Sequence, residues 1–185
     1  MVKLILGVAG TIGAGKDAIT NYLKDKYSFQ IIRVGDLVRE EIRLNKLQET
    51  RENEEHLSKK RVEEFGVGYW ARTLTQKIES SKNSNIAING VRRPAEATLP
   101  KKLFGDKFKL IFVDANTELR FKRLKARKRP GDPKTHSEFK KQEQAEWKIF
   151  DFEKTIKLAD FTIKNETTLE DLYKQLDELI AKLLK

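Results

Sequence analysis

Eight residues near the start of the chain constrain its fold more than any other feature. The stretch from Gly10 to Asp17 reads Gly-Thr-Ile-Gly-Ala-Gly-Lys-Asp, with the spacing of a phosphate-binding loop, or P-loop. The apolar run Leu4–Ala9 precedes it, and a segment with helical spacing of apolar residues follows it. In such a loop backbone N–H groups turn inward around phosphate oxygens, and the next helix directs its positive end at the anion. The sequence therefore predicts a phosphate site here.

The loop residues are expected to bind the phosphates of ATP together: Gly10, Thr11, Ile12, Gly13, Ala14, Gly15, Lys16 and Asp17. Lys16 reaches the β- and γ-phosphates as a mobile point charge. The position after this lysine normally holds Ser or Thr as an Mg²⁺ ligand, and here it holds Asp17. A carboxylate is a good ligand for Mg²⁺, so we predict that Asp17 holds the metal directly or through water. The alternative is a weakened metal site.

Short β-prone apolar runs alternate with stretches of helical spacing along the whole chain. The runs are Leu4–Ala9, Phe29–Val34, Ile86–Asn89, Lys109–Val113 and Phe161–Lys164. This alternation predicts a three-layer α/β fold, with a five-stranded parallel sheet covered by helices on both faces. Ligands of such sheets bind beyond the carboxyl ends of the strands. The polar intervals Arg39–Arg61 and Arg127–Thr135 follow that edge, and they either fold over a ligand or are ordinary exposed helix and loop.

Composition excludes some classes of protein and leaves others open. A length of 185 residues suits one domain, residues 1–185, and the absence of cysteine excludes disulfides and zinc–cysteine sites. The run Leu4–Ala9 is too short for a membrane span or the core of a signal peptide, so we expect a cytoplasmic protein without membrane partners. The net charge of +10 fits either nucleic-acid binding, which is not favoured, or a solvated lysine-rich surface. The oligomeric state stays open.

The segment Val34-Gly35-Asp36-Leu37-Val38-Arg39 resembles the nucleoside monophosphate kinases, which have Thr-Gly-Asp-Leu-Leu-Arg there. In that family the arginine binds the acceptor's phosphate. The resemblance therefore implies that Asp36 and Arg39 belong to an acceptor site, with an acceptor-binding segment near residues 36–80.

The end of the third predicted strand, Asn89-Gly90-Val91-Arg92-Arg93-Pro94, extends the resemblance. Adenylate kinases have Asp-Gly-Phe-Pro-Arg here, and archaeal adenylate-kinase-related proteins have Asp-Gly-Val-Arg. Arg93 matches the first pattern and Arg92 the second, so both are expected to bind phosphate. The acidic residue of the family is replaced by Asn89, which could ligate Mg²⁺ through water. We hypothesise that Asp17 restores the missing carboxylate.

The lid of the family begins with two arginines four residues apart, which contact the ATP phosphates. Arg123 and Arg127 have this spacing and share a helical face, and the lid is expected near residues 127–137. The run Ala159–Glu166 resembles the last strand of dephospho-CoA kinases and of the archaeal group. It places Asn165 where a loop faces the adenine, and a plain turn residue is the alternative.

The resemblance covers the chain from Leu4 to Leu183 and implies a P-loop kinase that uses ATP and Mg²⁺. The expected catalytic residues are Lys16, Asp17, Arg92, Arg93 and Arg127. A nucleotide-like small molecule such as AMP is the leading acceptor, and dephospho-CoA or a deoxynucleoside monophosphate are alternatives. An ATP-binding or ATP-hydrolysing switch that acts on an RNA or protein partner is the rival of another class.

Overall fold

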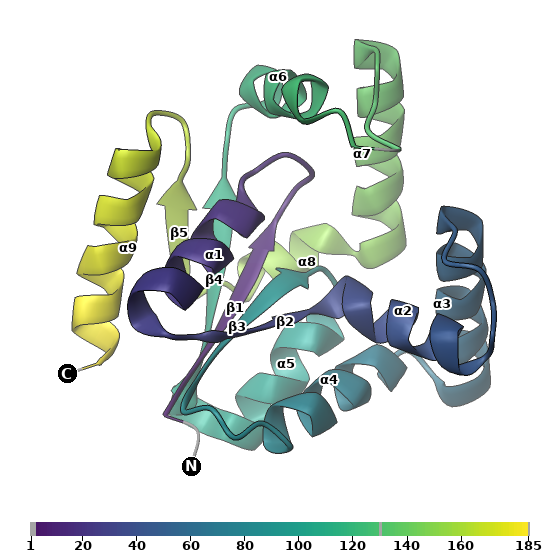
Figure 1. Cartoon of the computed structure of the whole chain (residues 1–185), viewed down its shortest axis with the longest axis horizontal. Coiled ribbons are helices and arrows are strands. Elements are labelled where there is room, and N and C mark those ends of the chain that lie inside the picture. The colour runs from purple at the N-terminus through teal and green to yellow at the C-terminus, as the bar shows by residue number, and fades with distance from the viewer. Residues whose placement is uncertain (1–2, 130, 185) are drawn as a thin grey trace.

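The apolar runs form one parallel sheet in the computed structural model, which describes residues 3–129 and 131–184 (Figure 1). Its strands are β1 (Leu4–Gly10), β2 (Gln30–Arg33), β3 (Asn85–Val91), β4 (Phe108–Asp114) and β5 (Phe161–Lys164). They lie in the order β2-β3-β1-β4-β5, and every neighbouring pair is parallel. This arrangement confirms the expected α/β fold.

Helices connect the strands and cover both faces of the sheet. They are α1 (Lys16–Tyr27), α2 (Val34–Leu44), α3 (Arg51–Phe65), α4 (Tyr69–Glu79), α5 (Pro94–Phe104), α6 (Thr117–Arg127), α7 (His136–Phe150), α8 (Phe152–Lys157) and α9 (Leu169–Leu183), with a short 3-10 turn at Gly105–Lys107. Among the described residues no helix is long and apolar enough to cross a membrane.

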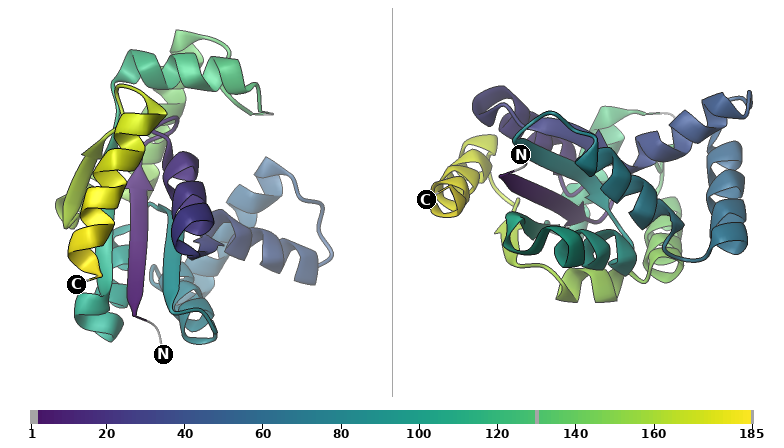
Figure 2. Two further views of the ribbon diagram at one scale, coloured as in Figure 1. Left: turned by 60° about the vertical axis from the view of Figure 1, so that its left-hand side comes forward. Right: turned by 90° about the horizontal axis from the view of Figure 1, so that it is seen from below.

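Alternation of side chains along the central strand separates the core into two layers. Leu4, Leu6 and Val8 of β1 pack with residues of α1 and α9. Ile5 and Ala9 point the other way and pack with residues of α2, α4 and α5. Figure 2 shows α1 and α9 on one side of the sheet and α4 and α5 on the other. Because both faces are buried, β1 is apolar throughout, as parallel sheets require.

Two local departures from the expected strands shape the ligand edge. The second strand is shorter than the predicted Phe29–Val34, because Val34 already begins α2, so Gly35 and Asp36 lie in the first turn of that helix. In the β1–β3 pair, Val8 pairs with Asn89 but Ala9 pairs with Val91, so the register shifts there. The extra residue is Gly90, whose φ of 87° lies in the left-handed region.

Candidate functional site

The loop between β1 and α1 has the backbone of a phosphate cradle. Gly13 and Gly15 have φ values of 78° and 101°, in the left-handed region where a Cβ would be strained. Lys16 begins α1, and its Nζ donates to the carbonyl oxygens of Gly10 at 2.6 Å and Thr11 at 3.0 Å. The ammonium thus lies across the loop, on a flexible stem from which it can turn to a phosphate.

The electrostatics of Lys16 show that several cations converge on this loop. Burial lowers the pKa of Lys16 to about 8; the positive charges of Arg92 and Arg127 also lower it, and the negative charges of Glu146 and Asp17 partly oppose them. These arginines come from the turn after β3 and from the end of α6. A phosphate group would relieve this repulsion, because it supplies the negative charge that the cluster lacks.

Asp17 is held in a fixed orientation by the strand end. Asn89 donates from its amide nitrogen to Asp17 Oδ1 at 2.8 Å and to Thr20 Oγ1 at 2.9 Å. The other carboxylate oxygen faces Arg129 at 3.3 Å. Burial opposes ionisation of Asp17, but the hydrogen bond from Asn89 and the charges of Arg129 and Lys16 outweigh it and keep the pKa below its usual range. Asp17 is therefore an oriented carboxylate, and Asn89 orients it; the water-mediated metal contact of Asn89 stays a prediction.

The donor set fits Mg²⁺ only in company with a nucleotide. In the part of the chain that the structure describes, no three His, Asp, Glu or Cys side chains gather around a point that could hold a metal. Mg²⁺ in kinases is commonly held by one or two carboxylates, several waters and the substrate phosphates. Asp17 can supply that carboxylate, and the phosphates in the adjacent loop would supply the rest.

Asn165 supports the P-loop from behind. Its side chain is 3% exposed; Nδ2 donates to the carbonyl oxygen of Ala14 at 2.8 Å, and Oδ1 accepts from Arg123 Nη2 at 3.1 Å. A Cβ on Gly15 would lie 2.2 Å from Asn165 Nδ2, so this close approach requires the glycine. The structure thus shows a positioning role for Asn165, whereas the predicted contact with adenine is untested.

Two arginines of α6 lie against this support. Nη1 of Arg123 is buried without a hydrogen-bond partner among the described residues, and burial lowers the pKa of this guanidinium. The contact of Arg123 with ATP stays a prediction. Arg120, which the sequence analysis missed, donates to the carbonyl oxygens of Ile12 at 3.2 Å and Ala115 at 3.0 Å, and pairs with Glu143 at 2.6 Å. Its place one turn before Arg123 is the signal that could have identified it.

The loop after α6, where the lid is predicted, carries a second pair of contacts. Arg127 donates to both oxygens of Asp132, from Nε at 2.8 Å and from Nη2 at 2.5 Å. These bonds raise the pKa of Arg127 and keep the pKa of Asp132 below its usual range. Arg129 crosses to Asp17, as described above. The sequence analysis missed Asp132 and Arg129, because pairing within an irregular loop leaves no periodic pattern.

The two arginines after β3 are organised by a buried acid and by an aromatic ring. Glu96, which is 3% exposed, accepts from the backbone N–H groups of Arg92 at 2.8 Å and Arg93 at 3.2 Å. Their guanidinium carbons lie 5.1 and 4.9 Å from the ring centroid of Phe150. The sequence analysis missed Glu96, although an acid three residues after a helix N-cap is a capping-box signal.

The predicted acceptor-binding segment contains Arg39 on α2, which is fixed by two carboxylates. Arg39 pairs with Asp36 on its own helix, and its Nη1 lies 3.3 Å from Glu54 Oε1 on α3. A second network joins Glu41 to Arg61 at 2.5 Å and also to Tyr69. The structure therefore gives Asp36 the role of a partner of Arg39, and neither residue's contact with an acceptor is tested.

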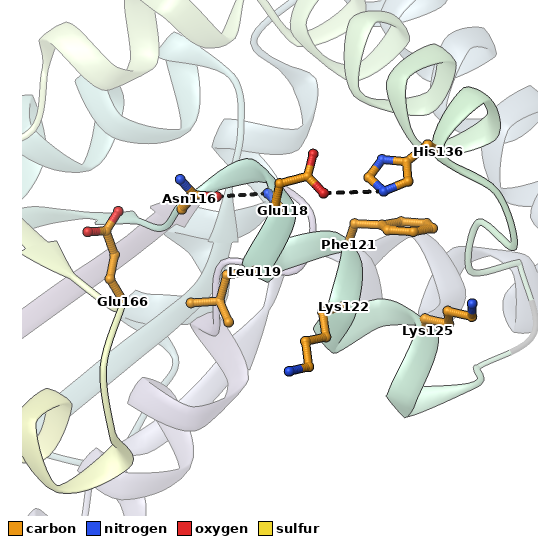
Figure 3. Close-up of a pocket in the computed structure, with 8 residues that line it drawn as sticks. All are labelled: Asn116, Glu118, Leu119, Phe121, Lys122, Lys125, His136 and Glu166. Atoms are coloured by element: carbon orange, nitrogen blue, oxygen red, sulfur yellow. Dashed lines mark hydrogen bonds and ion pairs between the residues drawn. The ribbon is translucent and has the colours of Figure 1, made fainter.

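A groove of about 700 Å³ runs along α6 toward the loop after β5. Figure 3 shows its lining, which consists of Asn116, Glu118, Leu119, Phe121, Lys122, Lys125, His136 and Glu166. At one end His136 pairs with Glu118 at 3.2 Å, and its ring lies 4.0 Å from that of Phe121. At the other end Glu166 directly follows Asn165, so the groove adjoins the support of the P-loop.

Comparison with known proteins agrees with this geometry. The profile of a family described as an AAA domain matches residues 6–148. A UPF0200 protein of Hyperthermus butylicus is 33% identical over 181 residues, covering 98% of this chain and 95% of the relative. Another, of Thermococcus onnurineus, is 31% identical with 98% of each covered. The chain belongs to the AAA domain family and to the UPF0200 proteins.

Solved structures share the fold at low sequence identity. TT1252 from Thermus thermophilus has a TM-score of 0.61 at 19% identity, covering 99% of both chains. Shikimate kinase from Acinetobacter baumannii in complex with shikimate has a TM-score of 0.61 at 13% identity, covering 98% of this chain and 96% of that one. Together with the family match, these likenesses show a P-loop kinase-like, nucleotide-binding fold.

Proposed function

We propose that this UPF0200 protein is an ATP-dependent phosphotransferase whose acceptor is a small phosphate-bearing molecule, in the first place a nucleoside monophosphate such as AMP. The observation that carries the proposal is the convergence of Lys16, Arg92 and Arg127; burial lowers the pKa of Lys16 to about 8, and the charges of the two arginines contribute to this. Lys16 belongs to the donor loop and Arg92 to the neighbouring strand end. A donor and an acceptor phosphate placed between them would each meet part of this charge.

Phosphoryl transfer needs positioning and charge neutralisation more than covalent chemistry. In this proposal Lys16 and Arg123 hold the transferred and neighbouring phosphates of ATP, while Arg92 and Arg93 hold the acceptor phosphate. Mg²⁺, when bound, neutralises charge on the triphosphate, and Asp17 is its protein ligand. Lid residues 127–137 would exclude water from the transferred group.

The experiment is a panel of acceptors tested for ADP formation from ATP. We expect AMP to stimulate ADP formation at least tenfold over ATP alone, with a deoxynucleoside monophosphate and dephospho-CoA as the compared acceptors. Lys16→Ala serves as the inactive control. A chain that binds ATP but shows no stimulation by any of the three would contradict the proposal.

Two observations favour a function of another class. The strand end carries Asn89 rather than a carboxylate, and the chain has a net charge of +10, so slow ATP hydrolysis that serves an RNA or protein partner is the second candidate. It predicts acceptor-independent ADP formation. RNA binding measured over a salt series would test the nucleic-acid version, because phosphate contacts make affinity fall steeply with salt.

A further inference from the structure

One face of α7 is turned toward the body of the protein. Phe139, Glu143, Glu146 and Phe150 recur at intervals of three and four residues, so they share one face of the helix. Phe139 is fully buried and the other three are half-buried, whereas residues 147–149 are exposed. Each of these four residues lies near a different part of the candidate site.

The contacts of this face run from the donor side to the acceptor side. Glu143 pairs at 2.6 Å with Arg120, which supports the P-loop, and the charge of Glu146 acts on Lys16. At the end of the helix, the ring of Phe150 lies under Arg92 and Arg93. The helix that follows the lid loop therefore touches both predicted half-sites.

The ring of Phe150 meets a pair of cations that repel each other. Burial and the neighbouring Arg92 lower the pKa of Arg93, with Glu96 opposing them. Arg93 Nη1 also lies 3.5 Å from the carbonyl oxygen of Ile149, in the last turn of α7. The negative face of an aromatic ring and the negative end of a helix both attract guanidinium groups.

A ring holds an arginine without occupying its donors. Arg39 and Arg127 are held by carboxylates, which accept from the N–H groups that a phosphate would need. An aromatic face attracts the charge while the N–H donors stay in the guanidinium plane, and apart from the contact of Arg93 Nη1 with Ile149 they are left for a phosphate. An arginine held by a carboxylate therefore has fewer N–H donors left for a ligand than an arginine held by an aromatic ring.

We infer that Phe150 is a positioning residue, which holds Arg92 and Arg93 together and ready to bind the acceptor phosphate. The inference rests on the proposed function, since it gives these arginines to the acceptor. In this inference α7 contributes to acceptor binding through the aromatic ring of Phe150.

The test compares Phe150→Leu, which keeps apolar bulk, with Phe150→Tyr, which keeps the ring face; Ile149→Ala, at an exposed neighbouring side chain, is the matched control. We expect Phe150→Leu to weaken AMP binding in calorimetry about tenfold, the loss of a substantial cation–π contact. Phe150→Tyr and Ile149→Ala should stay within about twofold, and ATP affinity should stay within about twofold in all three variants.

A second readout is independent of the acceptor. Loss of the ring in Phe150→Leu should shift the Nε–Hε NMR resonances of Arg92 and Arg93 and leave that of Arg39 in place. Unchanged AMP affinity in Phe150→Leu, or equal losses of AMP and ATP, would overturn the inference.

If the wild type binds no AMP, the acceptor proposal itself is wrong. Inorganic phosphate titrated against the same arginine resonances then decides the role of Phe150. Weaker phosphate binding in Phe150→Leu than in Phe150→Tyr would support it, and equal binding would refute it.

Discussion

Behind the P-loop the polar contacts are buried, whereas those of Arg39 in the predicted acceptor segment lie near the surface. Asn165 and Arg120, which are 3% and 5% exposed, donate to carbonyl oxygens of the loop itself. In the acceptor segment the Arg39 and Glu54 side chains are 33% and 32% exposed. Buried hydrogen bonds are costly to break, while exposed ion pairs contribute about 0–1 kcal/mol.

Apolar packing differs in the same direction. The P-loop and α1 rest on the core through Ala14, Ile19 and Leu23, which are fully buried. Parts of residues 36–80 are buried as deeply, at Ile42 and Leu74, but Leu44 and Val67, which flank α3, are 81% and 76% exposed. The difference teaches that the P-loop is built in advance, while the part of the predicted acceptor segment around α3 is held by contacts that a ligand could exchange.

The largest effect is expected at the donor loop itself. Lys16→Ala should lower acceptor-dependent turnover by about 10²–10³-fold or more, since it removes the charge aimed at the transferred phosphate. Steady-state rates, with a thermal melt to show that the variant is folded, measure this. Near-normal turnover in a folded Lys16→Ala protein would refute the P-loop assignment.

The support behind the loop should govern stability. Arg120→Met leaves Glu143 without its charge partner and two carbonyl oxygens without a donor, so we expect unfolding free energy to fall by about 3–5 kcal/mol. Arg43→Ala, which removes an exposed pair with Glu49, should cost less than about 1 kcal/mol. Equal losses in urea titrations of the two variants would break the contrast between the regions.

Arg39 should show the opposite signature. Arg39→Ala should raise the Michaelis constant for AMP by about 10-fold or more, because a charged hydrogen bond contributes about 1.5–3 kcal/mol. Its melting temperature should change little. Arg43→Ala, one turn further along α2, is the matched control and should leave the constant for AMP unchanged. If Arg39→Ala instead loses ATP and keeps AMP, the two half-sites are reversed.

Substitutions of Asp17 distinguish two roles for this residue, as an Mg²⁺ ligand or as a negative charge that repels ATP. As a metal ligand, its replacement by Ala should raise the Mg²⁺ concentration for half-maximal rate by about tenfold, and Asp17→Ser should recover part of the loss. If Asp17 instead only repels the triphosphate, its removal would tighten ATP binding and leave the Mg²⁺ requirement unchanged. Mg²⁺ titrations at saturating ATP and AMP distinguish these, and superimposable curves would exclude the metal role.

The effect that is smallest near neutral pH concerns the proton on Lys16. Lys16 is charged below its pKa of about 8 and loses its proton above it. ATP affinity should therefore be constant up to about pH 8 and then fall, by up to about tenfold for each further pH unit. Lys16→Arg, whose guanidinium stays charged, should show no such fall. Calorimetric titrations between pH 7 and 9.5 test this, and parallel profiles would contradict it.

Sequence predicted the fold and the donor loop because both are encoded locally. Gly13 and Gly15 shape the loop through their backbone, and the side chain of Lys16 reaches back over the same loop, so their spacing alone identifies them. The sequence places Asn165 after a strand end. Its hydrogen-bond partner Ala14 lies near the other end of the chain, so no local pattern predicts that contact. The sequence also identifies Asp17, but not its orientation by Asn89. The Asn89 amide nitrogen donates to both Asp17 and Thr20, and a contact between a strand end and a helix far away in the sequence leaves no local pattern.

The contact of Asn165 with the loop also limits how the chain can evolve. Since a Cβ at Gly15 would lie 2.2 Å from the Asn165 amide nitrogen, the two positions form one steric unit drawn from opposite ends of the chain. A smaller residue at position 165 alone leaves a hole behind the loop, and it would remove only the clash with a side chain at position 15. The φ of 101° at Gly15 strains any Cβ there, so we expect Gly15→Ala to stay impaired even beside a second-site substitution at Asn165.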